Sequence, residues 1–298
     1  MIRPLRPETD AAGVVDLIHE AFPAGTTSIE GWLHQEAVVP ERARHAAWVA
    51  IVDGVVAGRA EATLKWWSES GAAFAGVSVG RAFQGRGLGT DLWEHAERHL
   101  GGLGASRVTT MFVETTAGVR FARARGFDEA RAETLSCVDP TTIEPAKADP
   151  EFRVVPLAEV DPAEVYEVDL VTTPDVPTTD AVDAMPYEEW LDTEWRRPTL
   201  ALEGSFGAIV DGRLASFTLL AANVEIGRAF TEYTATLREY RGRGLADRVK
   251  RASLAWAAAQ GIHAAWTTND ETNAAMLSVN ARLGYATRLR RVEYVRER

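Results

Sequence analysis

The chain has 298 residues, a formal net charge of −11 and a hydrophobic content of 46%, which suits two domains of about 150 residues, each with its own core. The acidic balance argues against nucleic-acid binding, which needs basic patches, and no apolar run reaches the ~18 residues of a membrane span. The N-terminus lacks the apolar stretch of a signal peptide, and the single cysteine, Cys137, fits a reducing compartment, so a cytoplasmic location is expected.

The predicted elements of the first half begin with an amphipathic helix at 11–22. A β-hairpin follows at 46–64, with Asp53-Gly54, a pair typical of two-residue turns, between its strands. A strand at 73–79 leads into a glycine-rich stretch and a helix at 87–100. A strand at 107–113, a short helix ending at Gly126 and a last strand complete the half.

The second half repeats this order. "AIVDG" recurs at an offset of 158 residues, "QGRGLG" is matched by "RGRGLA" at 157, and "RGF" is matched by "LGY" at 158. Three landmarks in one order at a constant spacing indicate a duplicated domain. The proline-rich segment 137–152 is the expected linker, which places the domains at 1–145 and 151–298. The elements of the second copy are expected at 206–220, 229–237, 244–260, 263–269, 273–285 and 288–295. Strands that alternate with helices predict α/β or α+β layering.

The glycine stretch at 84–89 and its copy at 241–246 each stand between a strand and a helix. Closely spaced glycines let the backbone approach a phosphate, and the free N–H groups of the first helical turn point at it. A Walker A loop needs Gly-Lys-Ser/Thr, which neither copy has. A dinucleotide fingerprint needs a third glycine where Thr90 and Asp247 stand. The alternative is a tight turn without a ligand.

The pattern that remains is Gln/Arg-x-x-Gly-x-Gly/Ala, at 84–89 and 241–246. It resembles the coenzyme A pyrophosphate loop of the GNAT acyltransferase superfamily, and in each half a helix, a glycine and an aromatic residue follow about forty residues later. The resemblance covers nearly the whole chain as two tandem units. It implies an α/β (α+β layered) fold in which each half is a mixed, mostly antiparallel sheet flanked by helices.

The resemblance also implies which residues bind the coenzyme A thioester, through the strand before each loop, the loop itself and a following helix. In the first half these are Val77, Val79, Gln84, Gly85, Arg86, Gly87, Leu88, Gly89 and Thr90. In the second half they are Thr234, Ala235, Thr236, Arg241, Gly242, Arg243, Gly244, Leu245, Ala246 and Asn273.

Comparison of the two copies favours the second as the catalytic one. The family's asparagine near the pantetheine falls at Asn273 in the second copy and at Thr115 in the first. The family's thiolate-protonating tyrosine falls at Asn280 and at Ala122, so both copies depart from the pattern there.

Glu232 is the candidate base, because it is the only carboxylate on the strand before the loop of the second copy. Period-two alternation predicts that it shares a strand face with Thr234 and Thr236. The alternative is a surface glutamate at a strand end.

Other residues are weaker candidates. Cys137 is more typical of an inert thiol than of a nucleophile. His95 and His99 have i, i+4 spacing but no third ligand, so no metal is expected. Trp66-Trp67 is expected to pack rather than to line an acceptor pocket. A final, weaker base candidate is Glu61 on a neighbouring strand.

These patterns predict transfer of an acetyl group from acetyl-CoA to a primary amine of a small molecule, or of a peptide or protein, in the C-terminal half. The alternative is a non-catalytic acyl-CoA-binding or scaffolding protein. No nucleic acid, membrane or metal partner is expected, and an oligomer is compatible with the sequence. The sequence carries no signature that identifies the acceptor.

Overall fold

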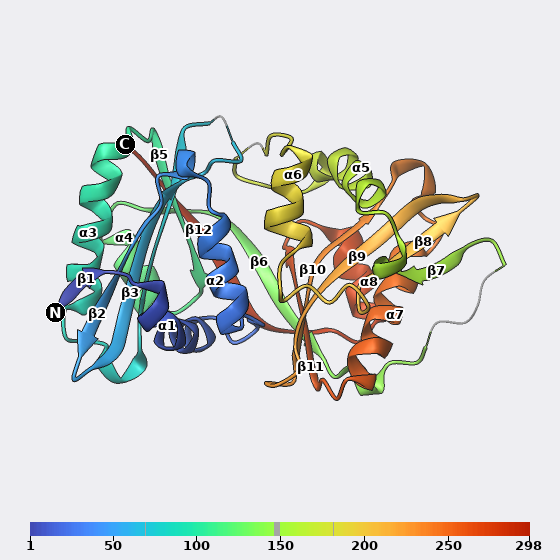
Figure 1. The fold of residues 1–298 in the computed structure, drawn as a ribbon, viewed down its shortest axis with the longest axis horizontal. Coiled ribbons are helices and arrows are strands. Elements are labelled where there is room, and N and C mark those ends of the chain that lie inside the picture. The colour runs from blue at the N-terminus through green and yellow to red at the C-terminus, as the bar shows by residue number, and fades with distance from the viewer. Residues whose placement is uncertain (69, 146–149, 181) are drawn as a thin grey trace.

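The computed structural model describes residues 1–68, 70–145, 150–180 and 182–298. Two halves lie side by side, and each consists of strands with helices packed against them (Figure 1). The helices of the described residues are α1 (Pro7–Ala21), α2 (Ile29–Val38), α3 (Leu88–Leu103), α4 (Thr116–Arg123), α5 (Pro162–Thr172), α6 (Tyr187–Trp190), α7 (Leu245–Ala259) and α8 (Ala274–Arg282). The strands are β1 (Ile2–Pro4), β2 (Ala46–Val52), β3 (Val55–Leu64), β4 (Ala72–Val79), β5 (Arg107–Val113), β6 (Asp128–Val138), β7 (Arg153–Pro156), β8 (Phe206–Val210), β9 (Arg213–Asn223), β10 (Arg228–Thr236), β11 (Ala264–Asp270) and β12 (Ala286–Glu297).

The predicted element order is present in both halves, and the hairpin turns match the prediction. Asp53 and Gly54 have φ values of 50° and 80°, and Asp211 and Gly212 have 49° and 79°. Two consecutive left-handed residues are the requirement of a type I′ turn, which Asp-Gly satisfies at little cost. The repeat in sequence is therefore a repeat of backbone conformation.

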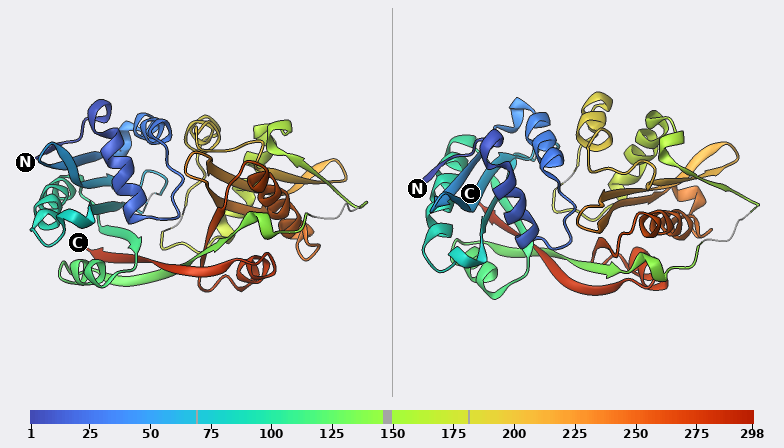
Figure 2. Two further views of the ribbon diagram at one scale, coloured as in Figure 1. Left: turned by 90° about the horizontal axis from the view of Figure 1, so that it is seen from below. Right: turned by 60° about the horizontal axis from the view of Figure 1, so that its bottom comes forward.

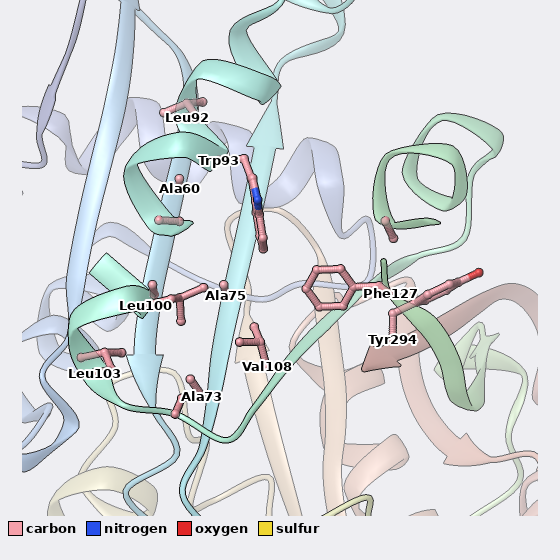
Figure 3. Close-up of a cluster of buried hydrophobic side chains, with 14 of the residues drawn as sticks. Ala60, Ala73, Ala75, Leu92, Trp93, Leu100, Leu103, Val108, Phe127 and Tyr294 are labelled. Atoms are coloured by element: carbon pink, nitrogen blue, oxygen red, sulfur yellow. The ribbon is translucent and has the colours of Figure 1, made fainter. Parts of the chain in front are cut away.

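Helix α3 covers one face of the first half's sheet (Figure 3). Its apolar residues Leu92, Ala96, Leu100 and Leu103 recur at helical spacing and are buried. The strands beneath present small side chains, among them Ala60 and the other alanines of β3 and β4. Helices α1 and α2 pack against the opposite face in a separate cluster, so the sheet lies between two helical layers.

The last strand of each half crosses to the other half, which the sequence did not predict. β6 pairs with β11 of the second half, and β12 pairs with β5 of the first. β6 and β12 also pair with each other, so the described strands form one twelve-stranded sheet in the order β1-β2-β3-β4-β5-β12-β6-β11-β10-β9-β8-β7. Figure 2 shows these two strands running together between the halves.

The crossing strands contribute to the cores that they enter. Tyr294 of β12 is buried in the first half's core and stacks on Phe112 with ring centroids 5.4 Å apart. Val138 of β6 belongs to the second half's core. Each half therefore needs a strand from the other to complete its core, although the repeat suggested two self-contained units.

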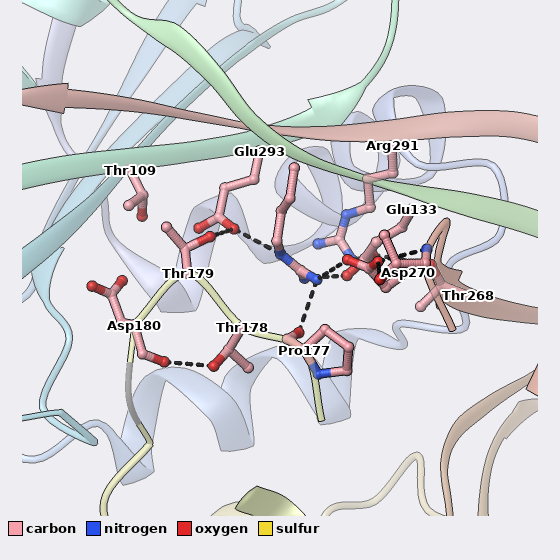
Figure 4. Close-up of polar contacts among 12 residues, drawn as sticks. Thr109, Glu133, Pro177, Thr178, Thr179, Asp180, Thr268, Asp270, Arg291 and Glu293 are labelled. Atoms are coloured by element: carbon pink, nitrogen blue, oxygen red, sulfur yellow. Dashed lines mark hydrogen bonds and ion pairs between the residues drawn. The ribbon is translucent and has the colours of Figure 1, made fainter. Parts of the chain in front are cut away.

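A buried ion-pair network lies where the halves join (Figure 4). Arg131 of β6 donates to Glu293 of β12 at 2.9 Å and to Asp270 of β11 at 3.1 Å. Residues 177–180, which we call the strap, run from the second half onto this network, where Asp180 contacts Lys65, the residue after β3, at 2.6 Å. Removing one partner of a buried ion pair is strongly destabilising, because the other charge is left buried without compensation.

The expected linker at 137–152 is only partly irregular, since β6 continues to Val138 and a short 3₁₀ turn spans Pro140–Thr142. Residues 146–149 lie outside the described residues. Within the described residues, no helix is long and apolar enough to cross a bilayer.

Candidate active site

Each half contains a pair of parallel strands that are hydrogen-bonded only at their beginnings. β4 pairs with β5 over Ala72–Phe74, and β10 pairs with β11 over Arg228–Thr231. Beyond these residues the described strands form no further pairs with each other. The backbone groups on the facing edges are then available to a ligand. Val77 and Val79 lie on the unpaired part of β4, and 234–236 lie on that of β10.

A glycine loop follows each of these strands, in nearly the same conformation. Gly85 and Gly87 have φ values of 74° and 85°, and Gly242 and Gly244 have 76° and 81°. A Cβ atom at any of the four would meet no atom within 4 Å, so the space above each loop is open. The positive φ values explain the glycines, since L side chains rarely adopt them.

The residue at the start of each loop anchors it to the preceding strand. Gln84 donates from Nε2 to the carbonyl of Val79 at 2.9 Å, and Arg241 donates from Nε to the carbonyl of Thr236 at 3.0 Å. This shared contact explains why the two copies keep a long side chain with an N–H donor at this position. Arg86 and Arg243 follow in the loops and contact the carbonyl of Ala82 and the carboxylate of Glu151, respectively.

The helices after the loops begin without a side-chain cap. Gly87 precedes α3, which starts with Leu88, Gly89 and Thr90, and Gly244 precedes α7, which starts with Leu245 and Ala246. The first-turn N–H groups of these two helices therefore lack the side-chain acceptor that Thr115 gives α4 and Asn273 gives α8. Uncapped N–H groups next to an open glycine loop form a site suited to a phosphate.

Carboxylates already neutralise some of the arginines beside the loops. Asp175 contacts both Arg238 and Arg241, and these arginine contacts lower its pKa below the usual range. Glu20 has the corresponding place in the first half, where it accepts from the backbone of Arg81 at 2.5 Å. The backbone N–H groups, rather than these arginines, are thus the donors left for an anion.

A β-bulge distinguishes the second half from the first. On β10, Thr231 faces Leu220 and Tyr233 faces Leu219, so Glu232 is an extra residue in the strand. β4 pairs with β3 in regular register. The predicted sharing of one face by Glu232, Thr234 and Thr236 is wrong, because the bulge interrupts the alternation.

The contacts of the side chains show this change of face. Thr234 contacts Thr218 on one face of β9 at 2.9 Å, whereas Tyr233 packs with Phe217 on the other. Glu232 contacts Arg197, which follows α6.

Sequence reasoning missed Arg197 and Glu194, which complete the surroundings of Glu232. Arg197 donates from Nη1 to Glu232 at 2.9 Å, and its second terminal nitrogen contacts the other carboxylate oxygen. The same nitrogen lies 3.4 Å from Glu194 Oε2. Burial opposes the charge of Arg197, but Glu232 outweighs this effect and raises the arginine pKa. The spacing of Glu194 and Arg197 indicates a helical pair, but nothing in the sequence links them to β10.

The two asparagines have different surroundings, Asn273 as the cap before α8 and Asn280 within it. Asn273 caps the helix by accepting from the N–H of Met276 at 3.2 Å, and Thr115 caps α4 in the same way. The two copies are therefore more alike here than the sequence suggested. Asn280 is buried and donates to Asn269 at 2.5 Å, while its own Oδ1 has no hydrogen-bond partner among the described residues.

The strap lies beside the paired part of β4 and β5 in the first half. Asp180 contacts Arg107, and Arg107 and Thr109 share a face of β5 because they are two residues apart. Figure 4 shows Thr109 beside Thr179 and Asp180. In the second half, the side chains of Glu232 and Glu194 keep 26% and 43% of their surfaces exposed. The carboxylates beside the parallel strands of the second half are therefore accessible, whereas the strap covers the corresponding region of the first half.

The remaining candidate residues are half-buried or make packing and ion-pair contacts with other side chains. Cys137 is half-buried on β6, and burial raises its thiol pKa. His95 and His99 pack against Trp48, and no group of three metal-ligating side chains occurs in the described part of the chain. Trp66 and Trp67 pack edge to face, and Glu61 contacts Arg59 at 2.6 Å.

A hollow of about 790 Å³ lies along α4, the helix after β5 in the first half. It is lined by Glu114, Thr115, Thr116, Val119, Arg120, Arg123 and Ala124. The corresponding positions in the second half replace Arg120 and Arg123 with Ser278 and Ala281. At these two positions the helix of the first half carries cationic side chains that the second half lacks.

The splayed parallel strands, the glycine loops and the uncapped helices define the class of protein. The sequence model of the acetyltransferase (GNAT) family matches residues 12–127 and 164–285, one match in each half. The chain belongs to this family, and it consists of two GNAT-like halves.

Solved structures share this fold over the full length of the chain. A tandem GNAT protein from the clavulanic acid biosynthesis pathway aligns with a TM-score of 0.75 and 21% identity, covering 100% of this chain and 98% of its own. A GCN5-related N-acetyltransferase from Sphaerobacter thermophilus gives 0.72 and 19%, covering 100% and 95%. A putative acetyltransferase from Pyrococcus horikoshii gives 0.62 and 15%, covering 100% and 89%. No curated protein matched the sequence.

Proposed function

We propose that the protein transfers an acetyl group from acetyl-CoA to a primary amine, and that the reaction takes place in the second half. The family supports acyl transfer in general. The observation that carries the assignment to the second half is the bulge at Glu232, located directly after the last paired residues of β10 and β11. A bulge at the point where two strands separate turns backbone groups toward the space between them.

In this proposal the pyrophosphate of the donor binds the loop at 241–246 and the first turn of α7. The pantetheine then lies between β10 and β11, where its amide groups pair with the free strand edges, as a further strand would. The thioester carbonyl reaches the bulge, where a backbone N–H stabilises the oxyanion that forms during attack. Asn280 is buried and bonded to Asn269, so solvent, rather than a side chain at this position, supplies the thiolate's proton.

The first half is proposed to bind a coenzyme A molecule without efficient transfer. Its glycine loop is open, and the hollow along α4 adds two arginines. The strap, however, occupies the space beside Thr109, and its β4 has no bulge. In this proposal the first half binds a donor without an acceptor, whereas the second half binds both.

The test is release of free thiol from acetyl-CoA in the presence of a panel of amines. The proposal expects thiol release that depends on the amine, with an acetylated product detected by mass spectrometry. The alternative, a non-catalytic acyl-CoA-binding or scaffolding protein, expects saturable binding of acetyl-CoA and no product with any amine. Gly244→Glu is the matched negative control, because it places bulk and charge in the open space above the second loop.

A further inference from the structure

Glu232 and Glu194 both contact Arg197, and Glu232 makes the more extensive contact. Both carboxylate oxygens of Glu232 contact Arg197, whereas Glu194 contacts it through one oxygen at 3.4 Å. The side chain of Arg197 is only 10% exposed, so this guanidinium cannot move away into solvent easily. To accept a proton, Glu232 would have to give up a partly buried, two-pronged ion pair. It is therefore better suited to hold Arg197 than to act as a base.

Glu194 is more accessible and lies in an unusual backbone segment. It belongs to a single π-helical turn, Leu191–Trp195, that continues from α6. Such turns are rare and are frequent at functional sites. Of the three charged groups it has the largest exposed fraction, and only one of its oxygens contacts Arg197, at 3.4 Å, so a substrate can reach its carboxylate without displacing a two-pronged ion pair.

Partial burial of Glu194 favours its protonation near neutral pH. Burial of the carboxyl raises its pKa to about 7; Arg197 opposes this rise, and Glu232 and Asp169 add to it. Because the side chain also reaches solvent, water screens part of these effects. Asp169 is held by the indole of Trp190 at 2.9 Å, and burial raises its pKa. From the first half, α2 contributes His34, whose Nε2 contacts the carbonyl of Asp192 in the same turn.

The cluster stands next to the place where β10 and β11 separate. Thr231 and Thr267 are the last paired residues of these strands, and Glu232 comes directly after Thr231. The first half closes one side, where Phe22 packs on Phe230 of β10 with ring centroids 5.9 Å apart. Asp169, Glu194 and Glu232 together carry more negative charge than Arg197 balances, which favours a cationic acceptor over an anionic one.

We propose that the acceptor is a cationic primary amine and that Glu194 receives its first proton. This inference rests on the proposed function of the second half. The ammonium N–H transfers its proton to the Glu194 carboxylate, which later releases it to solvent. The neutral amine attacks the thioester carbonyl, so that the C–N bond forms and the C–S bond breaks. The second proton leaves the nitrogen for solvent, and the departing thiolate takes up a proton to give the free thiol.

The experiment compares two acceptors in the full-length protein. An aliphatic amine has a pKa near 10 and is charged at neutral pH, whereas an arylamine is uncharged there. Glu194→Gln should lower kcat/KM for the aliphatic amine about 100- to 1,000-fold at pH 7, and the deficit should shrink as the pH approaches 10. With the arylamine the variant should stay within about threefold of the wild type, because no proton has to be removed before attack.

Glu188→Gln is the matched control, since Glu188 is an exposed glutamate in α6 with a long contact to Arg196, at 3.9 Å. It removes the same charge nearby and should leave both acceptors unaffected. An equal loss of rate with both acceptors in Glu194→Gln, or no loss with either, would overturn the inference.

Should Glu194→Gln fail to fold, the wild type still decides. With the aliphatic amine, kcat/KM of the wild type should fall toward acid pH with an apparent pKa near 7. With the arylamine this fall should be missing. If kcat/KM depends on pH in the same way for both acceptors, the inference is overturned. If the wild type transfers to neither acceptor nor to any amine of the panel, the proposed function itself fails.

Discussion

Lys250 offers a quantitative test of the structure, because it is a buried lysine for which the described residues provide no hydrogen-bond partner. Its side chain lies in α7, it is 1% exposed, and Nζ finds no partner among the described residues. Nζ lies 5.2 Å from the ring centroid of Tyr285. In the first half the equivalent residue is Trp93, which packs on Phe127. A lysine thus stands where the first half has an aromatic side chain.

Burial lowers the pKa of Lys250 from 10.5 to about 7. At about 1.4 kcal/mol per unit, the folded state at pH 7 carries a cost of about 5 kcal/mol. Between pH 7 and 10.5 the unfolded chain binds the proton and the folded chain does not, so the free energy of unfolding rises with pH over this window. Lys250→Met removes the cost and loses a cation–π contact worth about 1–2 kcal/mol. We expect a net stabilisation of about 3 kcal/mol at pH 7 that diminishes toward pH 10.5.

Urea unfolding followed by tryptophan fluorescence at pH 7 and pH 10 measures both values. Lys65→Met is the matched control, because Lys65 is a buried lysine that contacts Asp180 at 2.6 Å. Breaking this pair should destabilise the fold by about 2 kcal/mol or more at pH 7. If Lys250→Met is no more stable than the wild type at pH 7, the ammonium is not desolvated as the structure indicates, and the reasoning is refuted.

Three further predictions concern the ligand and the two halves. Coenzyme A at a hundredfold excess over its Kd should stabilise the fold by about 2.7 kcal/mol, and a thermal melt that millimolar coenzyme A does not shift would contradict the phosphate sites. Gly244→Glu should abolish thiol release while Gly87→Glu leaves substantial activity, because only β10 has the bulge; greater damage from Gly87→Glu in a folded protein would reverse the choice of half. Glu232→Gln should lower turnover by a factor that stays nearly constant from pH 6 to 10, because Glu232 holds Arg197; a deficit that vanishes at high pH would make Glu232 the base.

Local features of the fold were predictable from sequence because they depend on local chemistry. Asp53-Gly54 and the glycine loops each specify a backbone conformation that few other residues adopt. Period-two and helical patterns placed the strands and helices that they predicted close to the observed positions, but they did not predict α2, α5 or α6. The strand exchange was not predictable, because no local pattern in β6 or β12 specifies which half's sheet the strand joins. An intramolecular duplication offers two equivalent partners for each last strand.

The candidate site was predictable only where it follows the repeat. The loops and their anchors Gln84 and Arg241 repeat at the same spacing and were found. The bulge at Glu232 depends on pairing with β9, which no local pattern reveals. Glu194 and Arg197 approach β10 from a segment without a repeat or a signature, so their relation to Glu232 exists only in three dimensions.

Because β6 and β12 are exchanged, the two halves should stay associated even without the peptide connection between them. A protease that cut the chain between residues 145 and 151 would produce two fragments, each of which still holds a strand in the other's sheet and an apolar side chain in the other's core. The nicked protein should migrate as one particle under native conditions and separate only in denaturant. Expressed alone, either fragment would leave its last strand, β6 or β12, without a neighbour and would expose an unpaired edge of β5 or β11. We therefore expect each half to be soluble and folded only when the other is produced with it.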